Sequence, residues 1–204
     1  MRQNVFKTKW AVSGIVLGIL LIIAAAALYA VGSLAEESIS WQLTLVGKNN
    51  EQRVLSYDEI RSMPYEEAQG GFFTTVGVIN GPYEVKGVLL TDLCALVGGV
   101  TSSDIVSASA ADGYAMVFDY DQLGGDMDTY DPVDIHVVPH EKLMILLIYE
   151  QDGKPLSDSD GKPLRVAIAG SEALLTEGHN WVKWVNKIEV IPISAPESTP
   201  GAGS

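Results

Sequence analysis

The 204-residue chain contains a single cysteine, Cys94, and only three histidines. One thiol excludes an intramolecular disulfide, so the hydrophobic core has to stabilise the fold. The Gly-x-Ser-x-Gly motif of serine hydrolases is absent from the sequence. His136 and His140 have no evident serine or cysteine partner, and Pro139 would break the helix that an i, i+4 metal pair requires. Classical nucleophilic catalysis therefore has little support.

Basic residues are also scarce. The chain has 13 Lys and Arg against 26 Asp and Glu, a net charge of −13. Arg2, Lys7 and Lys9 precede an uncharged apolar run, so the remainder has 10 basic and 26 acidic residues, a net charge of −16. A surface of this kind repels nucleic acid and anionic lipid. We therefore expect no nucleic-acid partner.

The apolar run Trp10–Ala35 is long enough to cross a bilayer, which takes about 20 residues. Basic residues precede it, and Glu36 and Glu37 follow it. The positive-inside rule then predicts a single-pass protein of the cell membrane: a cytoplasmic N-terminus (1–9), a transmembrane anchor (10–35) and an extracytoplasmic domain. A cleaved signal peptide is the alternative, with a cleavage site at Ala27–Ala30, although its apolar region usually has about 7–15 residues.

Residues 38–193 show many short strand patterns and two or three short helices, which predicts a mixed α+β domain. The short apolar run Met144–Tyr149 fits either a buried strand or a helix. Residues 194–204 are rich in proline and small residues and predict a disordered tail. The expected strands are Ser38–Val46, Phe72–Ile79, Tyr83–Val88, Ile105–Ala110, Tyr114–Phe118, Leu164–Ile168, Trp181–Trp184 and Lys187–Ile193.

Two helix starts can be placed from capping signals. Ser56 with Glu59 three residues later has the spacing of a capping box. Thr91 is the expected N-cap of a second helix, which Gly98 ends. Cys94 lies on the apolar side of that second helix, and a free cysteine there behaves as a small buried hydrophobic residue.

Six motifs follow one another along the domain: Gly87–Gly98, Asp112–Tyr114, Asp152–Leu156, Gly161–Val166, Trp181–Trp184 and Lys187–Val190. Their order resembles that of the sulfite-oxidase-like, oxidoreductase molybdopterin-binding domain family. The resemblance extends from about Trp41 to Ile191 and implies that family's mixed β-sheet fold and, as a possible cofactor, molybdopterin.

The resemblance also implies a cofactor site. Molybdopterin carries a phosphate, which cations must surround, and the candidates in comparable stretches are Arg165, His179 and Lys183. Each also has an ordinary interpretation: an arginine paired with a carboxylate, a loop histidine and a solvated strand lysine. Active members of the family bind molybdenum through one cysteine thiolate upstream of the Gly-Val-x-Leu helix. The corresponding stretch, Thr74–Gly81, contains no cysteine, so no metal ligand is predicted.

Three functional hypotheses follow. The first is a membrane-anchored, degenerate and non-catalytic binding or assembly module, with a membrane-complex or redox protein as partner. The second is an active molybdopterin-dependent oxidoreductase with a non-cysteine metal site, for which Tyr114 could supply an oxygen ligand. The third is a cation-binding surface domain that uses the acidic loop 119–134, because calcium takes six to eight oxygen ligands. The carboxylates of that loop are Asp119, Asp121, Asp126, Asp128, Asp131 and Asp134.

Overall fold

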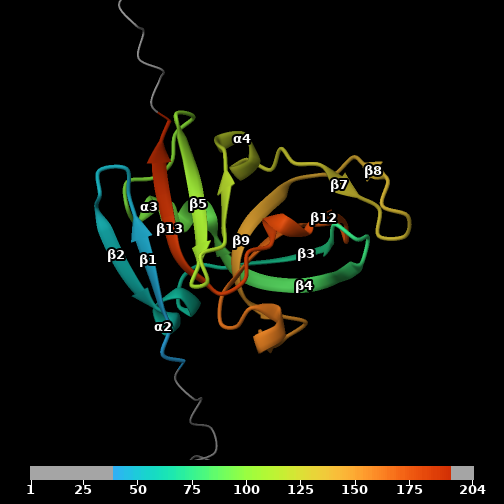
Figure 1. The fold of residues 1–204 in the computed structure, drawn as a ribbon, viewed down its shortest axis with the longest axis horizontal. Coiled ribbons are helices and arrows are strands. Elements are labelled where there is room, and N and C mark those ends of the chain that lie inside the picture. Colours follow the sequence, from blue (N-terminus) through green and yellow to red (C-terminus); the bar gives the residue numbers. More distant parts are fainter. Residues whose placement is uncertain (1–38, 194–204) are drawn as a thin grey trace, which may run out of the picture. The chain divides into compact units, whose positions relative to one another are not determined.

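Two β-sheets make up most of the part of the chain that the computed structural model describes, residues 39–193 (Figure 1). The five-stranded sheet joins both ends of residues 39–193, because the first strand along the chain pairs in parallel with the last strand along the chain. In spatial order its strands are β2 (Gln52–Ser56), β1 (Gln42–Val46), β13 (Val185–Pro192), β5 (Asp104–Ala110) and β6 (Ala115–Phe118).

The second sheet has eight strands, four of which close on themselves. β4 pairs with β3 and β9, and β11 pairs with the same two strands, so β3, β4, β9 and β11 form a ring. The other strands extend from this ring. The members are β3 (Glu66–Phe73), β4 (Ile79–Leu89), β7 (Thr129–Tyr130), β8 (Val137–Val138), β9 (Leu143–Gln151), β10 (Lys154–Pro155), β11 (Arg165–Gly170) and β12 (Leu175–Glu177).

The helices are short. They are α2 (Tyr57–Arg61), α3 (Leu90–Ala95), α4 (Tyr120–Leu123) and the 3-10 turns η1 (Asp158–Asp160) and η2 (Gly178–Asn180). The domain is therefore mostly β, with a smaller helical share than an α+β prediction suggests. Within residues 39–193, no helix has the length and apolar character needed to cross a membrane. The predicted N-terminus, anchor and tail lie outside the described residues.

Several expectations are confirmed. Ser56 caps α2, and its capping box with Glu59 is complete, since each side chain accepts from the other residue's backbone N–H. β5 and β6 form the hairpin expected around the Asp-Gly turn. The ambiguous run Met144–Tyr149 is part of a strand, β9, whose central residues are buried. Cys94 is fully buried in the core.

Three local predictions are wrong. The segment Phe72–Ile79 is not one strand but the end of β3, a turn and the start of β4. Trp181–Trp184 is not a strand either, because Trp184 has a φ of 53°, outside the β region. Thr91 does not cap α3. β4 leads directly into that helix, whose N-cap position is Leu89, without a side-chain hydrogen bond.

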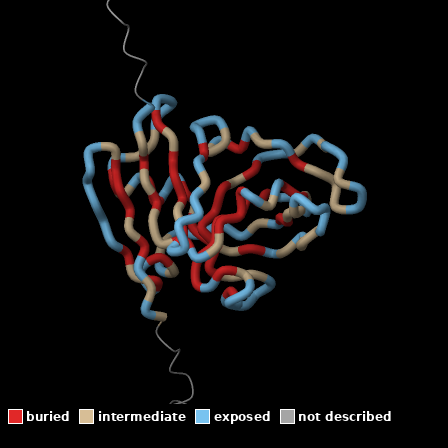
Figure 2. The backbone as a smooth tube through the Cα atoms, viewed as in Figure 1, coloured by how far each residue is buried: buried red, intermediate tan, exposed pale blue. Residues whose placement is uncertain are grey.

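Buried residues from the strands of both sheets form one hydrophobic cluster, and Figure 2 marks the buried positions along the backbone. β11 is buried along its whole length, since all six of its residues are buried. The buried side chains of β1, Leu43 and Leu45, alternate with less buried neighbours as a half-buried strand requires. A strand as fully buried as β11 accommodates a charged residue only for a structural or functional reason. Arg165 is that residue.

Candidate functional site

A cavity of about 370 Å³ lies at the start of β11, within the size range of small-molecule sites. Segments far apart in sequence form it: the turn between β3 and β4, the β5–β6 hairpin, β11 and the stretch from η2 to β13. Its lining residues are Phe72, Thr74, Asn80, Asp112, Tyr114, Arg165, Gly178, Trp181, Lys183 and Trp184.

Arg165 is the most unusual residue of this cavity. It is only 2% exposed, and its Nε atom is buried without a hydrogen-bond partner. Among the residues that the structure describes, its guanidinium forms no hydrogen bond or ion pair. Burial lowers the pKa of Arg165 to about 10, an effect that the charges of Asp160 and Tyr83 oppose. A buried cation without a hydrogen-bonded counterion is costly, and an anion in the cavity would relieve that cost.

Two aromatic rings hold the Arg165 guanidinium in place. Its Cζ atom lies 4.6 Å from the ring centroid of Phe72 and 5.1 Å from that of Trp181. Trp181 is itself fixed, because its Nε1–H donates to the buried Thr176 hydroxyl at 2.8 Å. Cation–π contacts of this kind attract the guanidinium but leave its N–H groups without acceptors. The charge is therefore held in position with its donors free.

Lys183 is the second cation of the cavity, and the loop that contains η1 positions it. Its Nζ donates to the Ser159 carbonyl at 2.5 Å. Gly161 permits the close approach: a Cβ there would lie 2.7 Å from the Lys183 Cβ, and its φ is +100°. Burial lowers the pKa of Lys183, and the neighbouring positive charge of Arg165 lowers it further. The charge of Asp160 opposes both pKa shifts, and an anion in the cavity would reduce the repulsion that Arg165 exerts on Lys183.

The β3–β4 turn supplies neutral polar groups. The Thr74 hydroxyl oxygen accepts from the backbone N–H of Val78 at 3.0 Å, which leaves the hydroxyl proton free to donate. Asn80 donates from its side-chain amide to the Val78 carbonyl at 3.3 Å. Asp112 is the one acidic residue that lines this cavity, and its carboxylate accepts from the Tyr114 N–H at 3.0 Å. The lining therefore carries two cations and one anion.

Of the three predicted cofactor-binding residues, two meet in the cavity and the third does not. The His179 side chain lines a neighbouring cavity and lies 3.4 Å from the Glu177 carboxylate. Its backbone carbonyl, however, accepts a 2.8 Å hydrogen bond from the Tyr114 hydroxyl. Tyr114 therefore links the β5–β6 hairpin to η2, a structural role that gives no support to the oxygen-ligand hypothesis. Sequence reasoning did not assign Phe72, Asn80 and Asp112 to the site, although Asp112 opens one of the family motifs and Asn80 lies in the stretch Thr74–Gly81.

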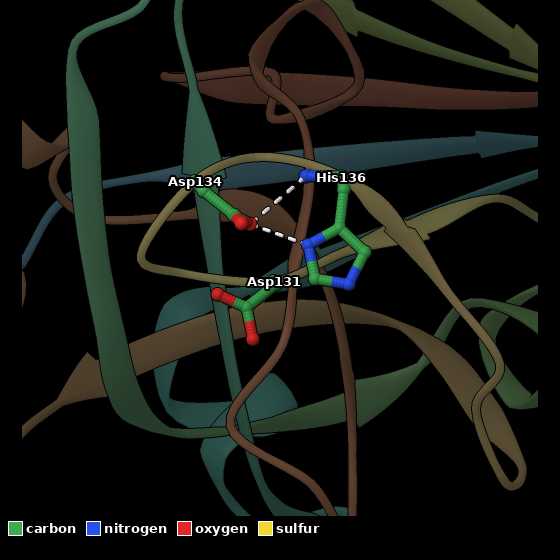
Figure 3. Close-up of side chains that lie close together, drawn as sticks. All are labelled: Asp131, Asp134 and His136. Atoms are coloured by element: carbon green, nitrogen blue, oxygen red, sulfur yellow. Dashed lines mark hydrogen bonds and ion pairs between the residues drawn. The ribbon is translucent and has the colours of Figure 1, made fainter.

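The acidic loop contains a separate cluster. Asp131, Asp134 and His136 bring three potential ligand atoms within 4.8 Å of one another, and Asp134 accepts hydrogen bonds from the backbone and ring of His136 (Figure 3). That ring hydrogen bond lowers the pKa of Asp134 and raises the pKa of His136. Asp119 instead caps α4. Cation binding by loop 119–134 stays a prediction, which an unchanged melting temperature in a calcium titration would eliminate.

The residues of the cavity fit the anionic part of a pterin cofactor but not its metal. Arg165 and Lys183 could face a phosphate, and the Thr74 hydroxyl in the same lining has a proton free to donate. No lining residue is a cysteine. Cys94 is buried in the hydrophobic core, and burial raises the pKa of its thiol to about 12, so it is protonated at neutral pH. A thiol in that state is a poor metal ligand.

The fold and the cavity thus define a mixed-sheet domain with a cationic pocket and no thiolate. The model of the family described as the oxidoreductase molybdopterin binding domain matches residues 31–198, and the chain belongs to this family. This confirms the family inferred from the motif order. No match was found among curated proteins.

A solved structure supports the same fold. The chain is similar to the sulfane dehydrogenase SoxCD from Paracoccus pantotrophus, with a TM-score of 0.57 and 19% sequence identity. The match covers 78% of this chain but 39% of the SoxCD chain. This chain therefore spans well under half of that protein, and the likeness concerns the fold alone.

Proposed function

We propose that this chain is a membrane-anchored, extracytoplasmic and non-catalytic binding or assembly module of the molybdopterin-binding family. Its cavity binds an anionic ligand without using molybdenum. The observation that carries this proposal is Arg165, a buried guanidinium without a hydrogen-bonded partner that lines a cavity together with Lys183. Membrane anchoring rests on the sequence run Trp10–Ala35.

Two features separate binding from catalysis. The stretch Thr74–Gly81 flanks the cavity and supplies a threonine and an asparagine to its lining, but no thiolate or carboxylate. Hydroxyl and amide groups are weak ligands for a metal that this family holds through sulfur. They are, however, suitable donors to a phosphate or carboxylate. The cavity therefore retains the donors that hold an anion without the soft ligand that holds the metal.

Calorimetric titration of the full-length chain with inorganic phosphate, in mild detergent, tests anion binding. We expect saturable binding that Arg165→Met abolishes and Lys183→Met weakens by about tenfold, since a hydrogen bond to a charged group contributes about 1.5–3 kcal/mol. Lys162→Met is the matched control, because Lys162 is exposed, lies three residues from Arg165 and does not line the cavity. Equal binding by all three variants would contradict the proposal.

Elemental and pterin analysis tests the non-catalytic part. Protein purified from its native host should contain far less than one molybdenum per chain. Stoichiometric molybdenum together with oxidase or reductase turnover would instead establish the active-oxidoreductase alternative. Replacement of Arg165 also distinguishes the non-catalytic module from the active oxidoreductase, because an active enzyme should lose cofactor content when this cation is removed.

A further inference from the structure

The rim of the cavity is apolar and exposed, although the domain as a whole is acidic. Trp184 and Tyr114 line the cavity and are 38% and 45% exposed. The turn that joins Thr74 to Asn80 carries Val76 and Val78, which are 82% and 55% exposed. Exposed aromatic side chains around a buried arginine have the composition of a protein–protein hot spot, where Trp, Tyr and Arg are enriched.

Trp184 is held in its exposed position at a conformational cost. Its φ of 53° belongs to the left-handed region, which is uncommon for a bulky residue. Both of its backbone polar groups are used: its N–H donates to Gly161 at 3.3 Å, and its carbonyl accepts from Ala111 at 3.3 Å. Strained backbone that its surroundings fix in this way clusters at functional positions. The strain presents an indole ring at the mouth of the cavity.

Charge determines what could dock here. Residues 10–204 have 10 basic and 26 acidic side chains, so an acidic partner is repelled by most of the surface. Arg165 and Lys183 line one cavity with a single carboxylate, Asp112, and the excess of positive charge there offers an acidic group a local attraction. The Arg165 guanidinium is already immobilised by Phe72 and Trp181, so little side-chain entropy is lost when a carboxylate binds it.

We infer that this surface docks an acidic segment of a partner protein, which places an Asp or Glu carboxylate on Arg165 and Lys183 and an adjacent apolar side chain against Trp184 and Tyr114. The inference rests on the proposed anion-binding function and names the class of its ligand. Repulsion elsewhere on the domain and attraction at one cavity give the complex a single orientation.

Selection of peptides on the full-length chain in mild detergent tests the inference. A displayed library of random dodecapeptides is selected on the wild type and, in parallel, on Arg165→Met. Enriched peptides should carry Asp or Glu beside an aromatic or aliphatic residue. Their affinity, measured by fluorescence polarisation, should fall at least tenfold with Arg165→Met or when the peptide's Glu is changed to Gln. Lys183→Met should reduce the same affinity, which keeps the test valid if Arg165→Met does not fold.

Substitutions at the rim separate this inference from simple anion binding. Trp184→Ala should weaken the selected peptides at least fivefold, which is more than it weakens phosphate binding. Tyr120→Ala is the matched control, because Tyr120 is 47% exposed and does not line the cavity. Phosphate binding without peptide enrichment, or peptide affinities indifferent to Arg165 and Trp184, would overturn the docking inference alone. If the wild type self-associates and Arg165→Met abolishes this association, the occupant of the surface is a second copy of the chain. That result would also overturn the docking inference. Absence of both phosphate and peptide binding would overturn the proposed function as well.

Discussion

Replacing Arg165 by Met should stabilise the folded domain. Burial lowers the pKa of this guanidinium to about 10, so the folded state disfavours the charged form. One pKa unit corresponds to about 1.4 kcal/mol. The fall of the Arg165 pKa from its ordinary value therefore means that the charged side chain destabilises the folded state by about 3 kcal/mol. The cation–π contacts with Phe72 and Trp181 return roughly 1–2 kcal/mol. We therefore expect Arg165→Met to raise the free energy of unfolding by about 1–2 kcal/mol at pH 7.

The pH dependence has a definite sign. The pKa of Arg165 is lower in the folded than in the unfolded chain, so the unfolded chain binds the proton more tightly. The penalty is present in full at neutral pH and fades only as the pH rises through about 10 toward the unfolded pKa. The difference between wild type and variant should therefore be constant from pH 6 to 9.

Urea unfolding of the full-length chain, followed by tryptophan fluorescence, measures this difference. Urea is preferable to guanidinium chloride, because the salt would screen the cavity and chloride could occupy it. Arg53→Met is the control: Arg53 is exposed on β2, and its loss should change stability by at most about 0.5 kcal/mol. If Arg165→Met lowered the free energy of unfolding by more than about 1 kcal/mol, the reasoning would be refuted, since Arg165 would then be a structural residue. Phosphate should raise the stability of the wild type and not of the variant.

Three further predictions concern the scaffold. Cys94 should not react with a disulfide reagent at pH 8 until urea unfolds the chain, because burial raises the pKa of its thiol to about 12. Ser56→Ala should lower the free energy of unfolding by about 1 kcal/mol in the same urea assay, since it removes a complete capping box. Asp104→Asn should destabilise the domain near neutral pH and matter less in acid. Hydrogen bonds from Thr101 and the Lys48 ammonium lower the pKa of Asp104, so its contribution is present above the ordinary Asp pKa and is lost as the pH falls through the lowered value.

The parts of the fold that could be predicted from the sequence are those with a local cause. The Ser56–Glu59 capping box and the Asp-Gly hairpin between β5 and β6 depend on residues within a few positions of one another. The family could also be inferred, because motif order survives where identity to solved structures is as low as 19%.

Predictions failed at two segments, one for a local reason and one because of tertiary contacts. Thr74, Val76 and Val78 are typical strand residues, yet they form a turn, because the Thr74 hydroxyl accepts from Val78 and Gly77 adopts a φ of 79°. Trp184 departs from a strand because its backbone bonds to Gly161 and Ala111 fix another geometry. No sequence periodicity reports contacts at such separations.

The candidate site also combines features that the sequence predicts with features that it does not. Arg165 and Lys183 could be named from their charge and motif, but their meeting with the β3–β4 turn depends on the pairing of β3, β4 and β11 within the ring. His179 stands two residues from Trp181 in the sequence, yet its side chain points into another cavity because η2 turns the backbone between them. Proximity in sequence is therefore a poor guide to membership of this cavity.

The acidic surface gives the cavity an unusual dependence on ionic strength. Between an anion and residues 10–204, which have 10 basic and 26 acidic side chains, the long-range force is repulsive, and salt screens it over a Debye length of about 8 Å at physiological ionic strength. Arg165 is buried and Lys183 is partly buried, so salt should weaken their short-range attraction for the ligand much less. Added salt should therefore speed the association of an acidic ligand while it lowers affinity only slightly. A basic anion-binding protein would show the opposite change in rate, since salt removes its long-range attraction. The −16 charge thus leaves local geometry at the cavity, rather than electrostatic attraction over distance, to select the ligand.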